Sequence, residues 1–253
     1  MRWSRQYQEP EAQRVNRWLA QSGVCSRREA EDLIARGLVS IDGQQVADPG
    51  HKIQPGQTLI LQDEAGAAAP FTAVMNKPVG YVSGQPEHGQ IPAARLLLRA
   101  NLIGDSPLHP ASDDSLPPLG RLDLDSRGLL LLSNDGVLAK AVIGPESKLE
   151  KVYLVQVQGA LTGARVERLR HGLSLDGRAL KPAGVTVVAA QTLQFVLREG
   201  RKRQIRRMCE LVDLRVSDLV RLRIGPLALG DLPEGRWRAL SPTEREALIT
   251  ASK

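Results

Sequence analysis

The sequence predicts an α+β protein made of a small N-terminal α/β domain and a larger domain built on a mixed, mainly antiparallel sheet with flanking helices. Residues 15–34 carry apolar side chains at helical spacing, whereas residues 150–157 alternate between apolar and polar, as a half-buried strand does. Asp-Gly and Pro-Gly turn signals separate several short apolar runs. Residues 63–70 are rich in Ala and Gly and have no periodicity. We therefore expect a domain over residues 14–62, a linker over 63–70 and a second domain over 71–253.

The composition is that of a globular protein with an excess of basic residues. The 253 residues carry a formal net charge of +6, from 34 Lys and Arg against 28 Asp and Glu, which weakly favours a polyanionic partner. No apolar run approaches the length of a membrane span, and the polar first residues lack the apolar segment of a secretory signal. The two cysteines imply no disulfide framework, and none of the four histidines has metal-ligand spacing. These features predict a cytoplasmic protein without a metal site or a membrane association.

The N-terminal domain is predicted to contain two short helices followed by a small hairpin. Residues 1–13 are polar, and we expect them to be disordered or loosely packed. The first helix follows and ends at Gly23, and a Ser-Arg-Arg-Glu capping box at residues 26–29 opens the second helix. An Asp-Gly pair at residues 42–43 then predicts a tight turn between two short strands.

Arginines are concentrated in the helical part of this domain. This part contains three carboxylates and five arginines, the latter being Arg14, Arg17, Arg27, Arg28 and Arg36. By themselves these charges fit either a solvated helical surface or a phosphate-binding surface. Residues 14–61 also resemble the S4-like RNA-binding domain, in the segments Arg-Val-Asn, Ser-Gly-Val-Cys-Ser-Arg-Arg-Glu-Ala and Val-Ser-Ile-Asp-Gly. The resemblance implies RNA binding, and we expect Arg17, Arg27 and Arg28 to hold phosphates, contacts that position the protein without reading sequence.

The second domain is predicted to begin with a strand from residue 71 that runs into Asn-Lys-Pro-Val-Gly at residues 76–80. Lys77 precedes a proline and must be extended, while Gly80 permits a close approach of the backbone. This segment is either the rim of a cleft or an ordinary turn, and the residues alone do not separate the two. Residues 84–118 predict one short helix and a long surface loop, to which we assign no function.

Segment 119–128 places carboxylates and arginines between glycines, directly ahead of the leucine run 129–132. The leucines predict a short buried strand, so Asp123 lies in the loop that enters a buried strand. Charges beside so apolar a run must be paired. An oriented, ionised carboxylate can act as a nucleophile, but a structural ion-pair network that includes Arg121 and Asp123 is the preferred interpretation from these residues alone.

The C-terminal half alternates strands, turns and helices. Tyr153 lies on the predicted strand 150–157, where a core aromatic is the ordinary interpretation. A helix is predicted over residues 161–171, an Asp-Gly hairpin at residues 176–177, and a last short helix over residues 242–248.

Basic residues are concentrated in segment 198–223. Nine basic side chains stand there against four acidic ones, a net charge of +5. Apolar spacing predicts a helix over residues 204–212, from which Arg203, Arg206 and Arg207 project around a buried stripe. A helix N-terminus surrounded by basic residues suits phosphate binding, and a solvated basic helix is the competing interpretation.

Four segments, taken together, resemble the RsuA/RluB/RluE/RluF type of pseudouridine synthase. They are Asn-Lys-Pro-Val-Gly at 76–80, Gly-Arg-Leu-Asp at 120–123, Lys-Val-Tyr-Leu at 151–154 and Gly-Arg-Lys-Arg-Gln-Ile-Arg-Arg-Met at 200–208, in the family's order. The resemblance implies that Asp123 is the catalytic residue, that Tyr153 stacks on the target base and that Arg206 pairs with Asp123. It adds a set of expected RNA contacts: Lys77, Arg121, Lys202, Arg203 and Arg207.

The same resemblance implies the reaction and the partner. A uridine in ribosomal RNA is isomerised to pseudouridine, a redox-neutral rearrangement that needs neither cofactor nor metal. We expect the substrate to be a structured stem-loop whose target uridine is flipped out of its stack. Pre-ribosomal particles are a second candidate partner, and nothing in the sequence requires more than a monomer.

The motif segments are most similar to the RluF branch, which acts on large-subunit (23S) ribosomal RNA. Two departures are the Pro- and Ser-rich loop before Leu119 and the Leu-Val-Asp at residues 211–213, where the family usually carries a glycine. A small-subunit enzyme is therefore an alternative, as is a noncatalytic RNA-binding factor for ribosome assembly. A DNA-binding regulator that uses the capped helix pair is a weaker third interpretation. It predicts equal affinity for duplex DNA and structured RNA at matched salt, because phosphate contacts alone would dominate.

Overall fold

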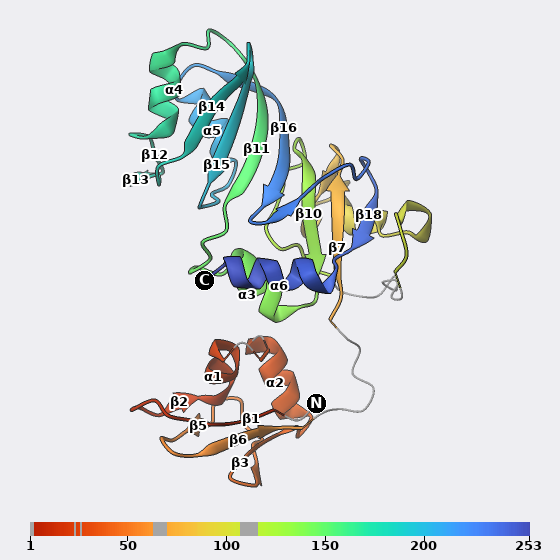
Figure 1. Ribbon diagram of the computed structural model, residues 1–253, viewed down its shortest axis with the longest axis vertical. Helices are drawn as coiled ribbons and strands as arrows, with labels where there is room; N and C mark the ends of the chain where they lie inside the picture. The colour runs from red at the N-terminus through yellow and green to blue at the C-terminus, as the bar shows by residue number, and fades with distance from the viewer. Residues whose placement is uncertain (1–2, 23, 26, 63–69, 107–115) are drawn as a thin grey trace. The chain divides into compact units, whose positions relative to one another are not determined.

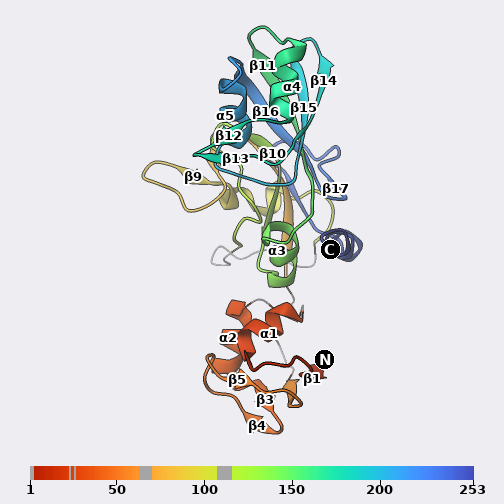
Figure 2. The same ribbon diagram turned by 90° about the vertical axis from the view of Figure 1, so that its left-hand side faces the viewer.

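The structure is a computed structural model that describes residues 3–22, 24–25, 27–62, 70–106 and 116–253. The chain divides into two compact units, one of residues 1–70 with 135–140 and one of residues 71–134 with 141–253. Figures 1 and 2 show both units as combinations of helices and sheet. The α+β class that the sequence predicts is confirmed.

The N-terminal unit combines two helices with a four-stranded sheet of order β1-β6-β3-β4. Its elements are α1 (Val15–Gln21), α2 (Arg27–Ala35), β1 (Trp3–Gln6), β3 (Val39–Ile41), β4 (Gln44–Gln45) and β6 (Thr58–Leu61), with β2 (Gln13–Arg14) pairing β5 (Lys52–Ile53). Trp18 and Leu19 of α1 and Ile34 of α2 pack with Leu59 of the sheet in one apolar core. This unit therefore has a core of its own.

The expectation that residues 1–13 are loose is wrong for their described part. Strand β1 pairs antiparallel with β6 from Trp3 to Gln6. Tyr7 is buried, with its ring edge-on to that of Trp18 at 5.2 Å between centroids. The polar composition of this segment concealed two aromatic residues that anchor it to the core. Gly23 and Ser26, which the sequence assigns to a helix end and a capping box, lie outside the described residues.

The larger unit is built on an eight-stranded sheet of order β14-β15-β11-β16-β10-β7-β18, to which β17 adds by pairing with β16. Its strands are β7 (Thr72–Lys77), β10 (Arg127–Ser133), β11 (Lys151–Gln158), β14 (Gly184–Ala189), β15 (Thr192–Leu197), β16 (Arg215–Ile224), β17 (Leu227–Ala228) and β18 (Trp237–Ala239). Strands β10 and β16 are parallel, and the other pairs of this sheet are antiparallel. The sheet is therefore mixed and mainly antiparallel, as expected.

Three helices belong to the larger unit: α4 (Gly163–Arg170), α5 (Gln204–Glu210) and α6 (Pro242–Ala251). A further helix, α3 (Gly136–Ile143), has residues 136–140 in the first unit and residues 141–143 in the second. Shorter pieces are β8 (Tyr81–Val82), β9 (Ile91–Pro92), β12 (Ser174–Leu175), β13 (Arg178–Ala179) and the 3₁₀ turns η1 (Ala93–Leu96) and η2 (Arg99–Asn101). Val166 of α4 and Met208 of α5 bury their side chains in one apolar core with strands β11, β14 and β15, and Figure 1 shows both helices beside these strands. The Asp176-Gly177 turn joins β12 to β13, with both residues at positive φ.

Strand β16 is the main element that sequence analysis missed. It lies in the middle of the sheet, between β11 and β10. Charged residues at Asp218, Arg221 and Arg223 interrupt its apolar alternation, so the segment looks basic rather than sheet-forming. Its ten residues nevertheless include a buried run from Leu219 to Arg221.

Gly128 allows β16 to lie beside β10. It has φ +104°, and a Cβ at this position would lie 2.4 Å from the backbone oxygen of Arg221. Any side chain would therefore meet rigid backbone as well as an unfavourable φ. The glycine that follows Arg127 is required by the parallel pairing of the two strands.

We predict that Gly128→Ala destabilises the protein by more than about 4 kcal/mol, because backbone strain and a backbone clash act together. Gly172→Ala is the matched control: Gly172 has φ +86° but no atom within 4 Å of a Cβ, so only strain, about 1–3 kcal/mol, applies. Urea unfolding of both variants measures the difference. Equal losses at the two positions would contradict the role given to the β10–β16 approach.

Candidate active site

A cavity of about 450 Å³ opens in the larger unit, among the loop that precedes β10, strands β11 and β16, and the start of α5. Six of the residues singled out in the sequence line it: Arg121, Asp123, Tyr153, Lys202, Arg203 and Arg206. These residues come from three segments that are far apart in the chain, and the sheet brings them together. Lys77 and Arg207 are not among its lining residues.

Asp123 is held in a tight turn. Its backbone carbonyl accepts a hydrogen bond from the amide of Ser126 at 3.1 Å. The preceding Leu122 is buried and is fixed by Ser83, whose hydroxyl accepts from the Leu122 amide and lies 2.9 Å from the Leu122 carbonyl. The Asp123 side chain is 36 % exposed. The loop therefore has a fixed backbone and an accessible carboxylate.

The arginine paired with Asp123 is not the expected one. Arg203 Nη1 lies 3.8 Å from Asp123 Oδ2, whereas Arg206 donates to the backbone carbonyl of Asp125 at 2.6 Å and to Ser126 Oγ at 3.3 Å. Arg206 Nη2 also lies 3.3 Å from the Asp125 carboxylate. Arg206 therefore acts on the loop next to Asp123, and the ion pair with Asp123 belongs to Arg203.

Asp125 binds both of these arginines. Arg203 donates to its two carboxylate oxygens at 3.1 and 3.0 Å in a bidentate arrangement. Burial alone would raise the pKa of Asp125, but the hydrogen bonds from Arg203 and the charge of Arg206 outweigh it and hold the pKa below its usual range. An ionised Asp125 fixes the position of both guanidinium groups beside Asp123.

Arg203 has an unusual backbone conformation. It precedes the first residue of α5 with φ 52° and ψ 33°, in the left-handed region that residues with a side chain seldom adopt. Such a conformation costs free energy and is retained where other contacts hold it, here the ion pairs with Asp123 and Asp125. Nothing in the local sequence indicates this conformation, because Arg203 lies in a run of basic residues.

Tyr153 lies on β11 and forms part of the cavity wall. Its neighbours in register are Arg221 on β16 and Phe195 on β15. Phe195 is fully buried, whereas Tyr153 is half-buried, packs against the apolar core that contains Phe195 and lines the cavity. Lys151, two residues earlier on the same face of the strand, also lines the cavity.

The proposed RNA contact of Lys77 is wrong. Its side chain is fully buried, and its ammonium donates to the carbonyls of Pro78 at 2.8 Å and Tyr81 at 2.7 Å. Burial lowers the pKa of Lys77 from its ordinary 10.5 to about 8, although nearby carboxylates, Asp123 first among them, act in the opposite direction. Through these two hydrogen bonds the Lys77 side chain stabilises the turn after β7. Nothing in the local sequence indicates this burial, because lysine is rarely buried.

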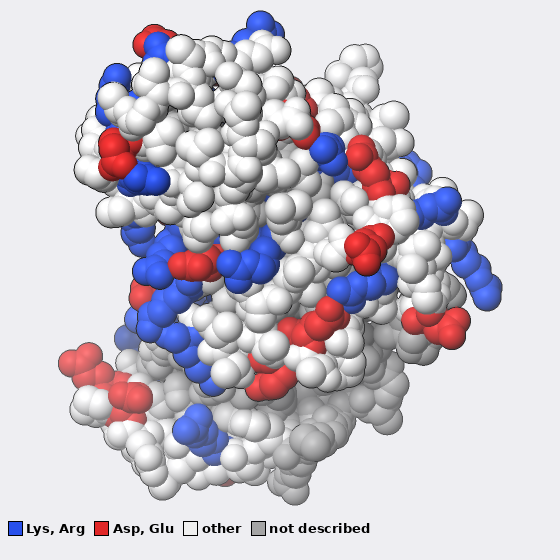
Figure 3. All heavy atoms as spheres, turned by 45° about the horizontal axis from the view of Figure 1, so that its top comes forward, with Lys and Arg blue, Asp and Glu red and all other residues white. Residues whose placement is uncertain are grey.

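The remaining basic residues singled out in the sequence differ in their partners. Arg207 forms a bidentate pair with Asp176, at 2.6 and 3.0 Å, and so braces the β12–β13 hairpin. Arg121 and Lys202 are exposed at the cavity, where they are available to phosphates. Figure 3 shows Lys and Arg side chains gathered in a band on one face of the protein, with acidic side chains among them.

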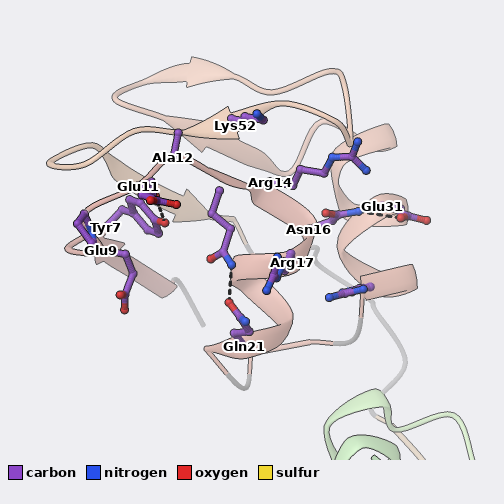
Figure 4. Close-up of a pocket in the computed structure, with 13 residues that line it drawn as sticks. Tyr7, Glu9, Glu11, Ala12, Arg14, Asn16, Arg17, Gln21, Glu31 and Lys52 are labelled. Atoms are coloured by element: carbon purple, nitrogen blue, oxygen red, sulfur yellow. Dashed lines mark hydrogen bonds between the residues drawn. The ribbon is translucent and has the colours of Figure 1, made fainter. Parts of the chain in front are cut away.

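A second hollow, of about 1130 Å³, lies in the N-terminal unit (Figure 4). Basic residues on its lining are Arg14, Arg17, Arg27 and Lys52. Arg17 and Arg27 are exposed, and the Asn16 amide donates to Glu31 at 2.8 Å between the two helices. Arg28 is exposed but lies outside this lining. The hollow thus brings together two of the three arginines that the sequence assigns to phosphates.

Comparison with known proteins shows the family. A family model described as RNA pseudouridylate synthase matches residues 72–211, and an S4 domain model matches residues 13–59. The chain belongs to the RNA pseudouridine synthase family. Its resemblance to the RsuA-type synthases with an S4 domain is confirmed, and the protein is an isomerase that acts on RNA.

Individual relatives agree with this assignment. An uncharacterized RNA pseudouridine synthase of Aquifex aeolicus is 34% identical over 94% of this chain and 94% of its own length. The dual-specificity RNA pseudouridine synthase RluF of Escherichia coli K12 is 34% identical over 91% of this chain and 76% of its own length. A crystal structure of a pseudouridylate synthase superposes with TM-score 0.64 at 26% identity, covering 93% of this chain and 99% of that chain.

Two further observations concern the described part of this RNA pseudouridine synthase. None of its helices there is both long and apolar enough to span a membrane. No group of three or more His, Cys, Asp or Glu side chains in the same residues is arranged to hold a metal ion.

We predict that Lys77 makes the stability of the synthase rise with pH between about 8 and 10.5. In this window the unfolded chain binds the Lys77 proton and the folded chain does not, so raising the pH favours the folded state. Below pH 8 the full cost of burying the ammonium applies. The unfolding free energy of the wild type, minus that of Lys77→Met, should rise by roughly 2–3 kcal/mol across the window in denaturant titrations. A difference that stays constant with pH would contradict the depressed pKa.

Proposed function

We propose that this synthase isomerises one uridine of large-subunit ribosomal RNA, with Asp123 as the catalytic residue. The observation that carries the proposal is the cavity itself, in which an accessible carboxylate faces a half-buried tyrosine and is flanked by arginines. A cavity of about 450 Å³ is large enough for one nucleoside but not for a duplex segment. The target uridine must therefore leave its stack to enter, which costs a few kcal/mol that backbone contacts can offset.

Four residues of the cavity have tasks in the proposed reaction. Tyr153 stacks on the base, and Asp123 acts on the sugar–base system as nucleophile or base. The C1′–N1 bond breaks, a C1′–C5 bond forms, and the proton lost from C5 is balanced by the proton gained at N1. Arg203 and Arg206, both held by Asp125, keep the Asp123 loop in position.

The choice of RNA rests on similarity. The motif segments are most similar to the RluF branch, and this supports a large-subunit target, with a small-subunit target as the alternative. Exposed arginines of the N-terminal unit suit a structured stem-loop, because they hold phosphates without reading bases. We propose a monomeric enzyme of the cytoplasm that modifies either free ribosomal RNA or pre-ribosomal particles.

Pseudouridine mapping tests the catalytic role. We expect purified protein to create one new pseudouridine in deproteinised large-subunit ribosomal RNA or in assembled large subunits, and Asp123→Asn to abolish it while still binding RNA. Asp231→Asn, which removes an exposed carboxylate outside the cavity, should modify the same site at the wild-type rate. If the new pseudouridine appeared only in small-subunit RNA, that RNA would be the substrate instead. If Asp123→Asn still formed pseudouridine, the catalytic role of Asp123 would be refuted.

Salt dependence tests the N-terminal unit. We predict that the double change Arg17→Gln, Arg27→Gln reduces the slope of log affinity against log salt by about 1.4 to 1.8, since each lost phosphate contact contributes about 0.7 to 0.9. Filter binding of a ribosomal RNA stem-loop at several KCl concentrations measures this slope. Arg36→Gln removes one charge from the same unit outside the hollow and should change the slope little. If Arg36→Gln reduced the slope by as much as each of the changes at Arg17 and Arg27, the hollow would have no special role in binding RNA.

A further inference from the structure

One buried arginine of the cavity has no task in the reaction described so far. Arg221, in the middle of β16, is 2 % exposed and lines the cavity that contains Asp123. Its Nε donates to the carbonyl of Leu129 at 2.7 Å, and its Nη1 lies 3.5 Å from the carbonyl of Arg121. These contacts fix the guanidinium plane against the start of β10 and the Asp123 loop.

The remaining nitrogen of this guanidinium is unsatisfied. Arg221 Nη2 is buried and has no hydrogen-bond partner among the described residues. No carboxylate of the described chain is paired with Arg221, whereas Arg203 and Arg206 share Asp125. An unpaired buried cation with an unused donor is costly, so its retention at a cavity wall points to a ligand that accepts the hydrogen bond.

Lys151 adds a second positive charge to the same wall. It lines the cavity and lies on β11, the strand that neighbours β16. Among the described residues its ammonium donates one hydrogen bond, a long one of 3.4 Å to the carbonyl of Leu149. Burial lowers the pKa of Lys151, and the charge of Arg221 lowers it further. The wall therefore combines two cations, neither of which is paired with a carboxylate in the part of the chain that the structure describes.

The register of the sheet indicates which part of a nucleotide meets these cations. Tyr153 and Arg221 are partners in the register of adjacent strands, next to a β-bulge that leaves Leu222 without a partner on β11, and both residues line the cavity. A base stacked on Tyr153 would turn its edge toward Arg221. Phosphates are strongly hydrated and belong nearer the exposed Arg121 and Lys202 than the buried Arg221.

We propose that Arg221 Nη2 donates a hydrogen bond to a carbonyl oxygen of the target uracil and stabilises the negative charge that the base acquires during the reaction. This proposal rests on the proposed function. When the C1′–N1 bond breaks, its electron pair remains on the base and is delocalised onto the two carbonyl oxygens. A fixed cation stabilises such charge effectively, because it needs no reorganisation during the reaction. Lys151 contributes to the same positive potential. The charge disappears when C1′–C5 forms, and the later loss of the C5 proton is balanced by protonation of N1.

Arg221→Lys tests the proposal, because it keeps the charge and removes the planar donor. We expect single-turnover pseudouridine formation to slow by about 100-fold or more, as for the loss of one oxyanion donor, while RNA affinity changes less than about 3-fold. Arg223→Lys is the matched control: it lies two residues along β16, bonds the Gly225 carbonyl at 3.0 Å and lies outside the cavity lining. This control should react at the wild-type rate.

A second substrate separates a catalytic from a structural role. Fluorine at C5 makes uracil a better leaving group, so its departure needs less help from Arg221. Arg221→Lys slows the loss of the glycosidic bond by a certain factor when the target is uridine. When the target is 5-fluorouridine, we expect that factor to be at least about 10-fold smaller. An equal loss on both substrates would indicate a structural role and overturn the proposal. If Arg221→Lys does not fold, Lys151→Met must show the same dependence on the leaving group, and a normal rate for that variant would also overturn it.

The outcomes separate this inference from the proposed function. If wild-type protein modifies ribosomal RNA and Arg221→Lys keeps pace with it, the inference is overturned and the proposed function stands. If wild-type protein forms no pseudouridine, both are overturned.

Discussion

The larger unit depends on the close approach of β10 and β16, the parallel pair in an otherwise antiparallel sheet. Gly128 makes this approach sterically feasible, because its missing side chain leaves room for the backbone of Arg221. The loop that precedes β10 carries Asp123, β16 carries Arg221, and β11 on the other side of β16 carries Tyr153. One backbone contact therefore fixes the relative positions of all three side chains.

Charge is distributed unevenly around the cavity. Asp125 accepts hydrogen bonds from both Arg203 and Arg206, which leaves Asp123 with a single, longer ion pair at 3.8 Å. Arg221 and Lys151 have no carboxylate partner among the described residues. A cavity with more cations than anions attracts phosphate-bearing chains and accommodates an electron-rich base. The positioning of Asp123 and the positive potential thus follow from the same sharing of one carboxylate.

The sequence predicted those elements that are determined by patterns within a short stretch of the chain. The leucines at 129–132 are all fully buried in β10, and the Asp-Gly pair at 176–177 forms its hairpin. Motif resemblance pointed to Asp123 and Tyr153, which the sheet places in one cavity. Strand β16 was missed because long-range contacts, such as the bidentate pair of Arg127 with Asp218, compensate charges that a single sequence shows as unpaired. Burial of Lys77 and the pairing of Arg203 with Asp123 depend likewise on segments distant in the chain.

The parallel seam of the sheet also has a mechanical meaning. Strands β10 and β16 share two residue pairs, whereas β10 with β7 shares six and β11 with β16 shares eight. The larger unit is therefore two broad antiparallel halves joined along a narrow line. Asp123 belongs to one half, and Tyr153 and Arg221 belong to the other. Side-chain contacts cross that line as well, since Arg127 pairs with Asp218 and Arg221 Nε donates to the Leu129 carbonyl, so a short ladder reinforced by two arginines holds the carboxylate and the tyrosine on either side of one cavity.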